Sequence, residues 1–464
     1  EVVMLSPVVS DRQEIVELLQ SLMNQGLAYL YKPERYARLR GGGHSFSSPT
    51  RVLETPAGEM IQEVVQPVLS PVVISHAQHQ SLVRIAKLWP VFLQAQLDIY
   101  RLAKTGKLDP LTCRMIKSMC TEKEWELGDT EPGYQAIHPF IRLDAVLDGD
   151  RFRVIDINST RPAGVGDIIA FNTALNGHLI HDGQAYRGQT YPICRAFTDI
   201  VRRCVDDWAG DRNLPGESIP IQIALRHGDG DWFNFFNLNF ALSGAGLASS
   251  LVDPESLCRD EACAVIRSRI KEGDPAYQLL EHGYPDKRCV MSPLYRRFLG
   301  NKLWMYLLSI EPTASIFKQA LGSDYNLLFE AMPDMGLVEQ GRLCLSSGER
   351  VRLDELSPKE WVFKDPASSS GRRMLLGFAM SSGKWHDALS MVRDGWVGQR
   401  FYRSQEKFLV ASENGEPKAQ KLYTKYGVYI FGSTLAGIEL HAREFPVVHG
   451  ARNTYFNSVM HKSQ

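Results

Sequence analysis

Two acidic side chains and an amide stand close together within residues 140–158. The stretch FIRLDAVLDGDRFRVIDINS places β-rich residues on either side of an Asp-Gly pair, which predicts two strands joined by a tight turn. Asp144 lies on the first strand, and Asp156 and Asn158 share one face of the second. Carboxylate and amide oxygens are ligands that Mg²⁺ prefers, usually together with phosphate oxygens. Taken alone, the pattern favours solvated acids on an ordinary hairpin, and a magnesium site is the alternative that would do chemistry.

A lysine and a small-residue loop follow about two hundred residues later. In EWVFKDPASSSGRRMLLGF, a predicted strand carrying Lys364 leads into a loop and then a second strand. Backbone N–H groups of such a loop can surround phosphate oxygens, and a lysine at its edge can bridge them. The loop residues are Ser368, Ser369, Ser370 and Gly371. An ordinary hairpin with a flexible tip is the alternative.

Two further segments carry polar groups suited to ligand binding. In WVGQRFYRS, Gln399 lies where a predicted strand passes into a turn, a position that can present an amide to a purine edge. The tail GIELHAREFPVVHGARNTYFN contains a polar cluster made of Arg443, Arg452, Asn453 and Asn457. Arginine suits two-pronged contacts to phosphate or carboxylate groups. Arginine is also common at domain interfaces, so a binding cluster and an interface both stay open for the tail. For Gln399 taken alone, an ordinary surface strand residue is the favoured interpretation.

Familiar catalytic motifs are absent from the sequence. GVGDII departs from a dinucleotide fingerprint at Ile169, and GFAMSSGKW has Trp385 where a P-loop needs Ser or Thr. There is no GxSxG or HExxH, and His76 and His79 lack the partners of a metal site. We therefore expect these two histidines to be surface or core residues.

The composition indicates an ordinary globular protein. The 464 residues carry 52 basic and 53 acidic side chains, and this net charge of −1 does not indicate a nucleic-acid or membrane partner. The eight cysteines contain no CxxC pair, which predicts reduced thiols in a cytoplasmic protein. Acidic residues replace the basic region of a signal peptide, and no apolar run is long enough to span a membrane.

Periodicity predicts a mixed α/β chain in three parts. Apolar spacing of three and four predicts helices over 11–31 and 77–123. The same spacing favours helices over 235–250, 295–310 and 323–340, while the chain is strand-rich from 351 onward. We expect a mainly helical region over 1–130, an α/β core with the metal-binding strands over 131–300, and a nucleotide-binding lobe over 301–464.

In their order along the chain, these pieces resemble the circularly permuted ATP-grasp proteins, which include glutathionylspermidine synthase-like enzymes. The resemblance covers 134–464 and rests on an acid-bearing strand, the D-I-N at 156–158 with STRPAG after it, VFKDPASSSGRRML, VGQRF, and the tail segments GIELHAREF and NTYFN. In ordinary ATP-grasp chains the metal-binding acids follow the lysine, whereas here they precede it. YRRFLGNKLWMYLL resembles the helix before the nucleotide lobe and contains Lys302. Two departures are Asp156, where the family commonly has Glu, and a loop with a single glycine.

The resemblance implies an ATP-dependent carboxylate–amine ligase that forms an amide bond through an acyl phosphate, with ATP and Mg²⁺ as cofactors. It implies Mg²⁺ binding by Asp144, Asp156 and Asn158, and phosphate binding by Lys364, Lys302 and the loop Ser368–Gly371. It places Gln399 near adenine, Arg443 at the acyl phosphate and Arg161 at a substrate carboxylate.

Two other functions stay open, namely a non-catalytic nucleotide-binding scaffold and a carboxylate kinase. The expected partners are a small-molecule carboxylate and amine, such as an amino acid, peptide or polyamine. The amino-terminal third either covers the substrate side or forms a homodimer.

Overall fold

The structure is a computed structural model. It describes residues 3–4, 50–54, 60–64, 66–68, 72–172, 189–226, 232–258, 261–268, 270, 272–366, 374–413, 416–446 and 454–462. The predicted helix over 11–31 and the loop Ser368–Gly371 lie outside these residues, as do Arg452 and Asn453.

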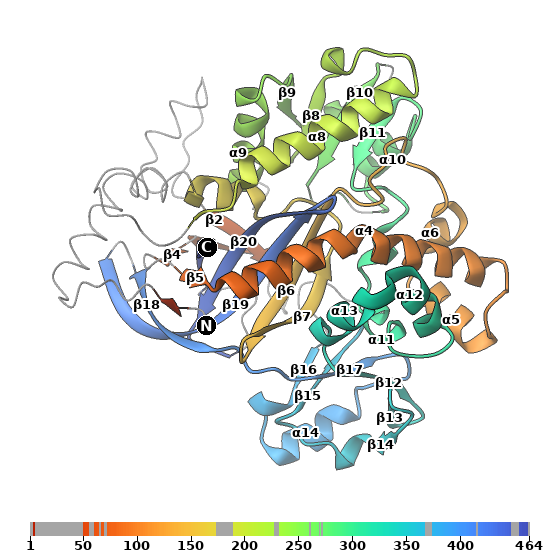
Figure 1. The fold of residues 1–464 in the computed structure, drawn as a ribbon, viewed down its shortest axis with the longest axis vertical. Helices are drawn as coiled ribbons and strands as arrows, with labels where there is room; N and C mark the ends of the chain where they lie inside the picture. Colours follow the sequence, from red (N-terminus) through yellow and green to blue (C-terminus); the bar gives the residue numbers. More distant parts are fainter. Residues whose placement is uncertain are drawn as a thin grey trace.

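A mixed sheet joins the two ends of the chain. Among the described residues it has nine strands in the order β1-β5-β21-β20-β19-β6-β7, with β18 beside β19 and β4 beside β21. The bounds are β1 Val3–Met4, β4 Gln66–Pro67, β5 Val72–Ile74, β6 Phe140–Asp148, β7 Arg151–Asn158, β18 Glu406–Glu413, β19 Glu416–Phe431, β20 Thr434–Arg443 and β21 Tyr455–His461. The predicted hairpin at 140–158 is confirmed as β6 and β7, which end this strand order, and β6 pairs with β19, almost three hundred residues away (Figure 1).

Three smaller sheets complete the described strands. A parallel sheet of order β11-β10-β8-β9 contains β8 Ile221–Ala224, β9 Ser249–Val252, β10 Cys263–Arg267 and β11 Arg288–Met291. An antiparallel sheet of order β14-β13-β12-β17-β15-β16 contains β12 Met335–Glu339, β13 Arg342–Leu345, β14 Arg350–Arg352, β15 Trp361–Lys364, β16 Met374–Leu376 and β17 Val397–Arg400. The hairpin of β2 Thr50–Glu54 and β3 Met60–Val64 stands apart. The antiparallel sheet, which we call the small lobe, contains both Lys364 and Gln399.

Helices cover the sheets on both sides. The α-helices are α4 His76–Lys104, α5 Pro110–Ser118, α6 Glu122–Leu127, α8 Ile193–Gly210, α9 Trp232–Gly244, α10 Pro275–Glu281, α11 Leu303–Leu307, α12 Thr313–Leu321, α13 Tyr325–Ala331 and α14 Ser382–Leu389. Residues 165–172 are also helical, and short 3₁₀ turns include η4 Arg297–Gly300 and η7 Gly377–Ala379. No helix among the described residues is long and apolar enough to cross a membrane.

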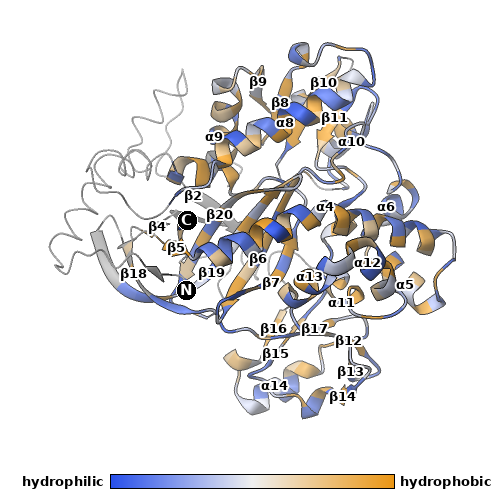
Figure 2. Cartoon of the chain, viewed as in Figure 1, coloured by the Kyte–Doolittle hydropathy of each residue, from blue (hydrophilic) through white to orange (hydrophobic). Residues whose placement is uncertain are grey.

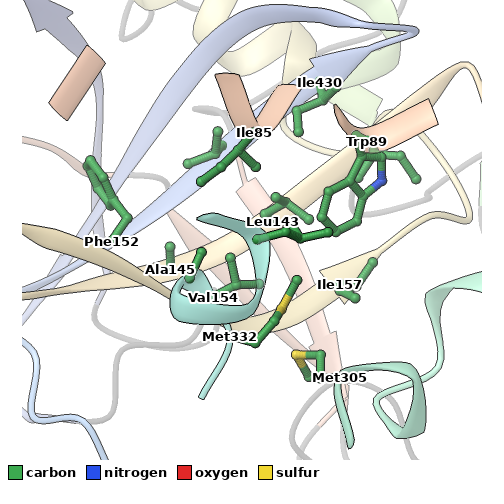
Figure 3. Packing of buried hydrophobic residues seen from close by; sticks show 14 of the residues in the cluster. Ile85, Trp89, Leu143, Ala145, Phe152, Val154, Ile157, Met305, Met332 and Ile430 are labelled. Carbon is green, nitrogen blue, oxygen red and sulfur yellow. The ribbon is translucent and has the colours of Figure 1, made fainter. Parts of the chain in front are cut away.

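The main core lies between α4 and one face of the nine-stranded sheet. Helix α4 begins with a capping box, in which the N–H of Gln78 donates to Ser75 Oγ and the N–H of Ser75 donates to Gln78 Oε1. Its buried stripe, which includes Trp89, packs with Leu143 of β6 and Ile157 of β7 (Figure 3). Polar residues occupy much of the rest of the helix, while β8, β10 and β11 are largely hydrophobic (Figure 2).

Three predicted helices differ from the structure for local reasons. The segment 323–340 ends its helix at Ala331 and continues as strand β12, because Pro333 cannot extend the helix. The segment 295–310 breaks into η4 and α11 at Gly300. The predicted helix at 235–250 is α9, which ends at Gly244 before strand β9. The eight cysteines are free thiols, as expected.

We predict that Leu143→Ala lowers the free energy of unfolding by about 2–5 kcal/mol, because it opens a cavity under α4 at a side chain that is 1% exposed. Urea unfolding followed by circular dichroism measures this loss. The matched control is Leu111→Ala on α5, where the leucine is 45% exposed and we expect less than about 0.5 kcal/mol. Equal losses in the two variants would contradict this account of the core.

Candidate active site

A β-bulge shapes the hairpin that carries the predicted metal ligands. Asp144 pairs with Asp156, but the next residue of β6 pairs with Val154, so Ile155 is left outside the regular ladder. The two aspartates are direct cross-strand neighbours and therefore share one face of the sheet. This register places the two acids side by side, as the sequence analysis expects. Asn158 is opposite Arg142 on the same face.

Asp144 is buried and its two carboxylate oxygens contact two cations. Arg142 Nε donates to Oδ1 at 2.9 Å, and Lys425 Nζ of β19 donates to Oδ2 at 2.7 Å. Burial alone would raise the pKa of Asp144, but the charges of Arg142 and Lys425 outweigh it and hold this pKa below its usual range. Asp144 is therefore ionised and holds buried Lys425 and largely buried Arg142 in place.

A second buried acid lies on the same face, two strands away from Asp144. Glu439 of β20 is fully buried, and its Oε2 lies 2.7 Å from His441 Nε2, 2.9 Å from the Tyr429 hydroxyl and 3.7 Å from an Arg142 nitrogen. Burial lowers the pKa of His441 to about 4, so this imidazole is neutral at pH 7. Gly427 lies between Asp144 and Glu439 in the ladder, where a Cβ would come within 3.1 Å of Arg142 Cδ.

These residues form what we call the polar face, defined as Arg142, Asp144, Lys425, Tyr429, Glu439 and His441 on β6, β19 and β20. Of these six residues, sequence reasoning identified only Asp144 and missed Arg142, Lys425, Tyr429, Glu439 and His441. The available signal was a set of ionisable residues inside the long strand-like stretch KYGVYIFGSTLAGIELHAR, which elsewhere is apolar.

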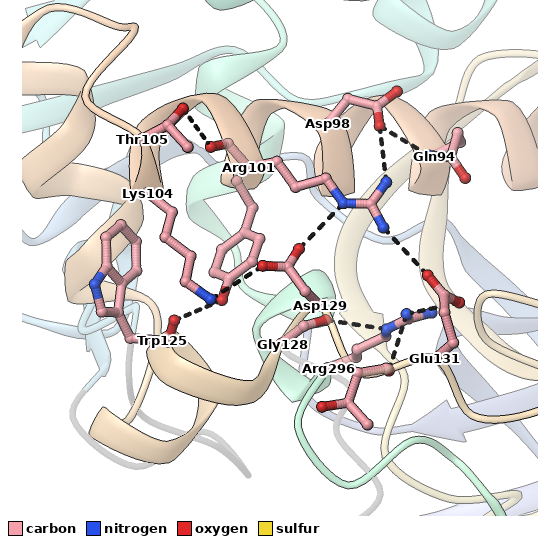
Figure 4. A network of polar contacts seen from close by, with 12 residues as sticks. Gln94, Asp98, Arg101, Lys104, Thr105, Trp125, Gly128, Asp129, Glu131 and Arg296 are labelled. Atoms are coloured by element: carbon pink, nitrogen blue, oxygen red, sulfur yellow. Dashed lines mark hydrogen bonds and ion pairs between the residues drawn. The ribbon is translucent and has the colours of Figure 1, made fainter. Parts of the chain in front are cut away.

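Lys302 lies against Asp156. Its Nζ is 3.0 Å from Asp156 Oδ1, with 14% of the lysine side chain and 30% of the aspartate side chain exposed. Gly300 permits this approach, because a Cβ there would lie 2.3 Å from Ser159 Oγ. The segment preceding Lys302 is anchored by buried Arg296, which donates to the carbonyls of Gly128 and Thr130 beside the ion pairs of α4 (Figure 4).

Lys364 joins the small lobe to the hairpin. Its Nζ donates to the carbonyl oxygen of the bulged Ile155 at 3.1 Å and to Gln399 Oε1 at 2.5 Å. Burial lowers the pKa of Lys364 to about 8, with Lys302 and Lys425 adding to the shift and Asp156 and Asp144 opposing it. Gln399 is 2% exposed on β17, so it is a buried partner of Lys364 in this structure. Lys302, Lys364 and Gln399 thus converge on the hairpin.

The two arginines of the predicted site lie at the rim of this arrangement. Arg161 follows β7 in the turn 161–164, which is held by Tyr429, whose hydroxyl is 2.8 Å from the Ala163 carbonyl. Gly164 has a φ of +86°, and a Cβ there would lie 2.3 Å from the same hydroxyl, so the turn requires glycine. Arg443 ends β20, two residues after His441, and its guanidinium lies 5.9 Å from the Phe445 ring centroid. The roles of both arginines stay predictions.

The donor set fits an oxygen-preferring cation only in part. Among the described residues, no group of three or more His, Cys, Asp or Glu side chains could hold a metal ion by itself. The Nδ2 of Asn158 is buried and has no hydrogen-bond partner in the described chain, and a half-turn of this amide presents its oxygen instead. Asp156 and Asn158 can therefore contribute two oxygens, and the other ligands of Mg²⁺ must come from a phosphate-bearing ligand and water.

Comparisons with known proteins address the fold. No protein-family model matches the chain, and no curated protein sequence matches it. A glutathione synthetase-like effector from Globodera pallida, solved in its apo form, is similar over 99% of both chains with a TM-score of 0.58 and 10% sequence identity. The described chain therefore has a glutathione synthetase-like fold. A putative gamma-glutamylcysteine synthetase from Methylobacillus flagellatus aligns over 80% of this chain and 87% of its own, at 13% identity and a TM-score of 0.37, which does not establish a shared fold.

We predict that the site binds an anionic nucleotide more weakly above about pH 8. Lys364 has a pKa of about 8, so it loses its charge above that pH, and affinity should fall by up to about tenfold per unit. Titration calorimetry with a non-hydrolysable ATP analogue from pH 7 to 9.5 measures this. Lys364→Met is the control, because its weaker binding should lack this decline. The same decline in both proteins would contradict the assignment.

The two aspartates should differ in their effect on stability. Asp144→Asn leaves buried Lys425 and largely buried Arg142 without their carboxylate, so we expect a loss of about 3–5 kcal/mol of unfolding free energy. Asp156→Asn removes a more exposed pair and should cost about 1 kcal/mol or less. Urea unfolding of both variants makes the comparison, and equal losses would show that Asp144 is not the structural acid.

Proposed function

We propose that this protein is an ATP-dependent carboxylate–amine ligase of the circularly permuted ATP-grasp type, which forms an amide bond and releases ADP and phosphate. The observation that carries the proposal is the contact between Lys364 Nζ of the small lobe and the Ile155 carbonyl of the hairpin, at 3.1 Å. This contact brings a lysine of one sheet to the acid-x-Asn strand of another. The glutathione synthetase-like fold supports the proposal without deciding the reaction.

In this proposal the chain binds and orients its ligands and neutralises their charge. Lys302 and Lys364 bind phosphate oxygens. Gln399 accepts a hydrogen bond from Lys364 and so holds it in place, and the same side of β17 contacts the adenine base. Asp156 and Asn158 would hold Mg²⁺, which would withdraw charge from the phosphates, while Asp144 keeps Arg142 and Lys425 in place.

The substrate acid lies beside this phosphate site. Arg161 binds a carboxylate at the turn that Tyr429 holds, and Arg443 stabilises the acyl phosphate that this carboxylate forms. An amine then displaces phosphate from the acyl carbon and yields the amide. Catalysis is therefore a matter of position and electrostatics, since no side chain forms a covalent bond to the substrate.

Product analysis tests the reaction. Incubation with ATP, Mg²⁺ and a panel of amino acids, peptides and polyamines should yield ADP, phosphate and a new amide. ADP with a stable phosphorylated acid would instead identify a carboxylate kinase. Nucleotide binding without turnover would identify a scaffold, and AMP with pyrophosphate would exclude an acyl-phosphate mechanism.

We predict that Asp156→Ala reduces turnover to below about 1% of wild type while the melting temperature changes by no more than a few degrees, because the side chain is partly exposed and lies at a strand end. Asp148→Ala is the matched control, since Asp148 ends the neighbouring strand with half of its side chain exposed. This control should retain full turnover. Wild-type rates in Asp156→Ala would remove Asp156 from the metal site.

A further inference from the structure

Both carboxylates of the predicted metal site are already paired with cations. Asp144 contacts Arg142 and Lys425, and Asp156 contacts Lys302 at 3.0 Å. The charge of Lys364 also interacts with the charges of both aspartates. With Glu439 included, the charged groups that interact around Asp144 and Asp156 are four cations and three carboxylates, so the site lacks the excess negative charge that attracts a free divalent cation.

The two acid–lysine pairs differ in how readily they can open. Lys425 lies within strand β19 with 4% of its side chain exposed, and its carboxylate partner also binds Arg142. Lys302 stands at the start of the short helix α11, and 30% of the side chain of its partner Asp156 is exposed. An incoming ligand can separate the second pair without leaving charges buried and unpaired, whereas the first pair is locked by its surroundings.

We propose that Lys302 is an exchangeable counter-ion, which neutralises Asp156 until a phosphate chain binds and then moves to that chain, so that Asp156 becomes available to the metal. This inference rests on the proposed nucleotide site. A polyanion attracts Lys302 and Lys364 away from their present partners, and the released carboxylate then faces Asn158 on the same strand face. The metal and the nucleotide therefore bind as a coupled pair, and the metal alone binds weakly.

Mn²⁺ titration without nucleotide tests the exchange directly, with electron paramagnetic resonance of free Mn²⁺ as the readout. Wild type should bind Mn²⁺ weakly, and Lys302→Met should bind it about tenfold or more tightly, because the competing ammonium is gone. Lys302→Arg keeps the positive charge and should behave as wild type. Lys318→Met on α12 removes a lysine from an exposed ion pair and is the matched control, with no change expected.

A second titration separates this inference from the proposed function. The non-hydrolysable ATP analogue should raise the Mn²⁺ affinity of wild type by at least about tenfold, and this gain should shrink in Lys302→Met. Circular dichroism confirms that each variant is folded. Equal Mn²⁺ affinities of wild type and Lys302→Met without nucleotide overturn the exchange, even if wild type binds the analogue. Failure of wild type to bind the analogue overturns the nucleotide site itself.

Discussion

Burial of opposite charges on one face of the nine-stranded sheet is the constraint on which the rest of the site depends. An isolated carboxylate inside a protein is costly, so Asp144 and Glu439 are tolerated only because Arg142, Lys425, Tyr429 and His441 contact them. The opposite face of the same strands packs against α4 in the apolar core. The sheet therefore has a fixed register, because a slip of one residue would exchange a charged face for an apolar one.

The polar face also determines where ligands can bind. Most of the polar face is buried, whereas 30% of the Asp156 side chain is exposed at its margin. There the bulge at Ile155 turns a carbonyl toward Lys364. Gly300 and Arg296 bring the Lys302 segment to this margin from a different part of the chain. Among the described residues, the small lobe thus contacts the sheet next to Asp156, the more exposed acid of the hairpin's two metal-ligand candidates.

Local pattern was sufficient to predict part of this arrangement. Alternation and the Asp-Gly turn predicted the hairpin, and the strand before the serine loop placed Lys364 correctly on β15. Lys425 and Glu439 were missed because they reach Asp144 only through the order of strands, across almost three hundred residues. The helix predicted over 323–340 is confirmed only as far as Ala331, because the apolar spacing that continues past Pro333 belongs to strand β12. The pairing of Lys302 with Asp156 depends on the close approach at Gly300, which no periodicity encodes.

A crystal structure with Mn²⁺ and a non-hydrolysable ATP analogue tests the central claim most directly. The account predicts an anomalous Mn²⁺ peak bound by Asp156 and Asn158, with phosphate oxygens within hydrogen-bond distance of Lys364 and Lys302. In that structure Lys302 should have left Asp156, while Lys425 still contacts Asp144. A nucleotide bound elsewhere, or a metal bound away from Asp156, would contradict the account.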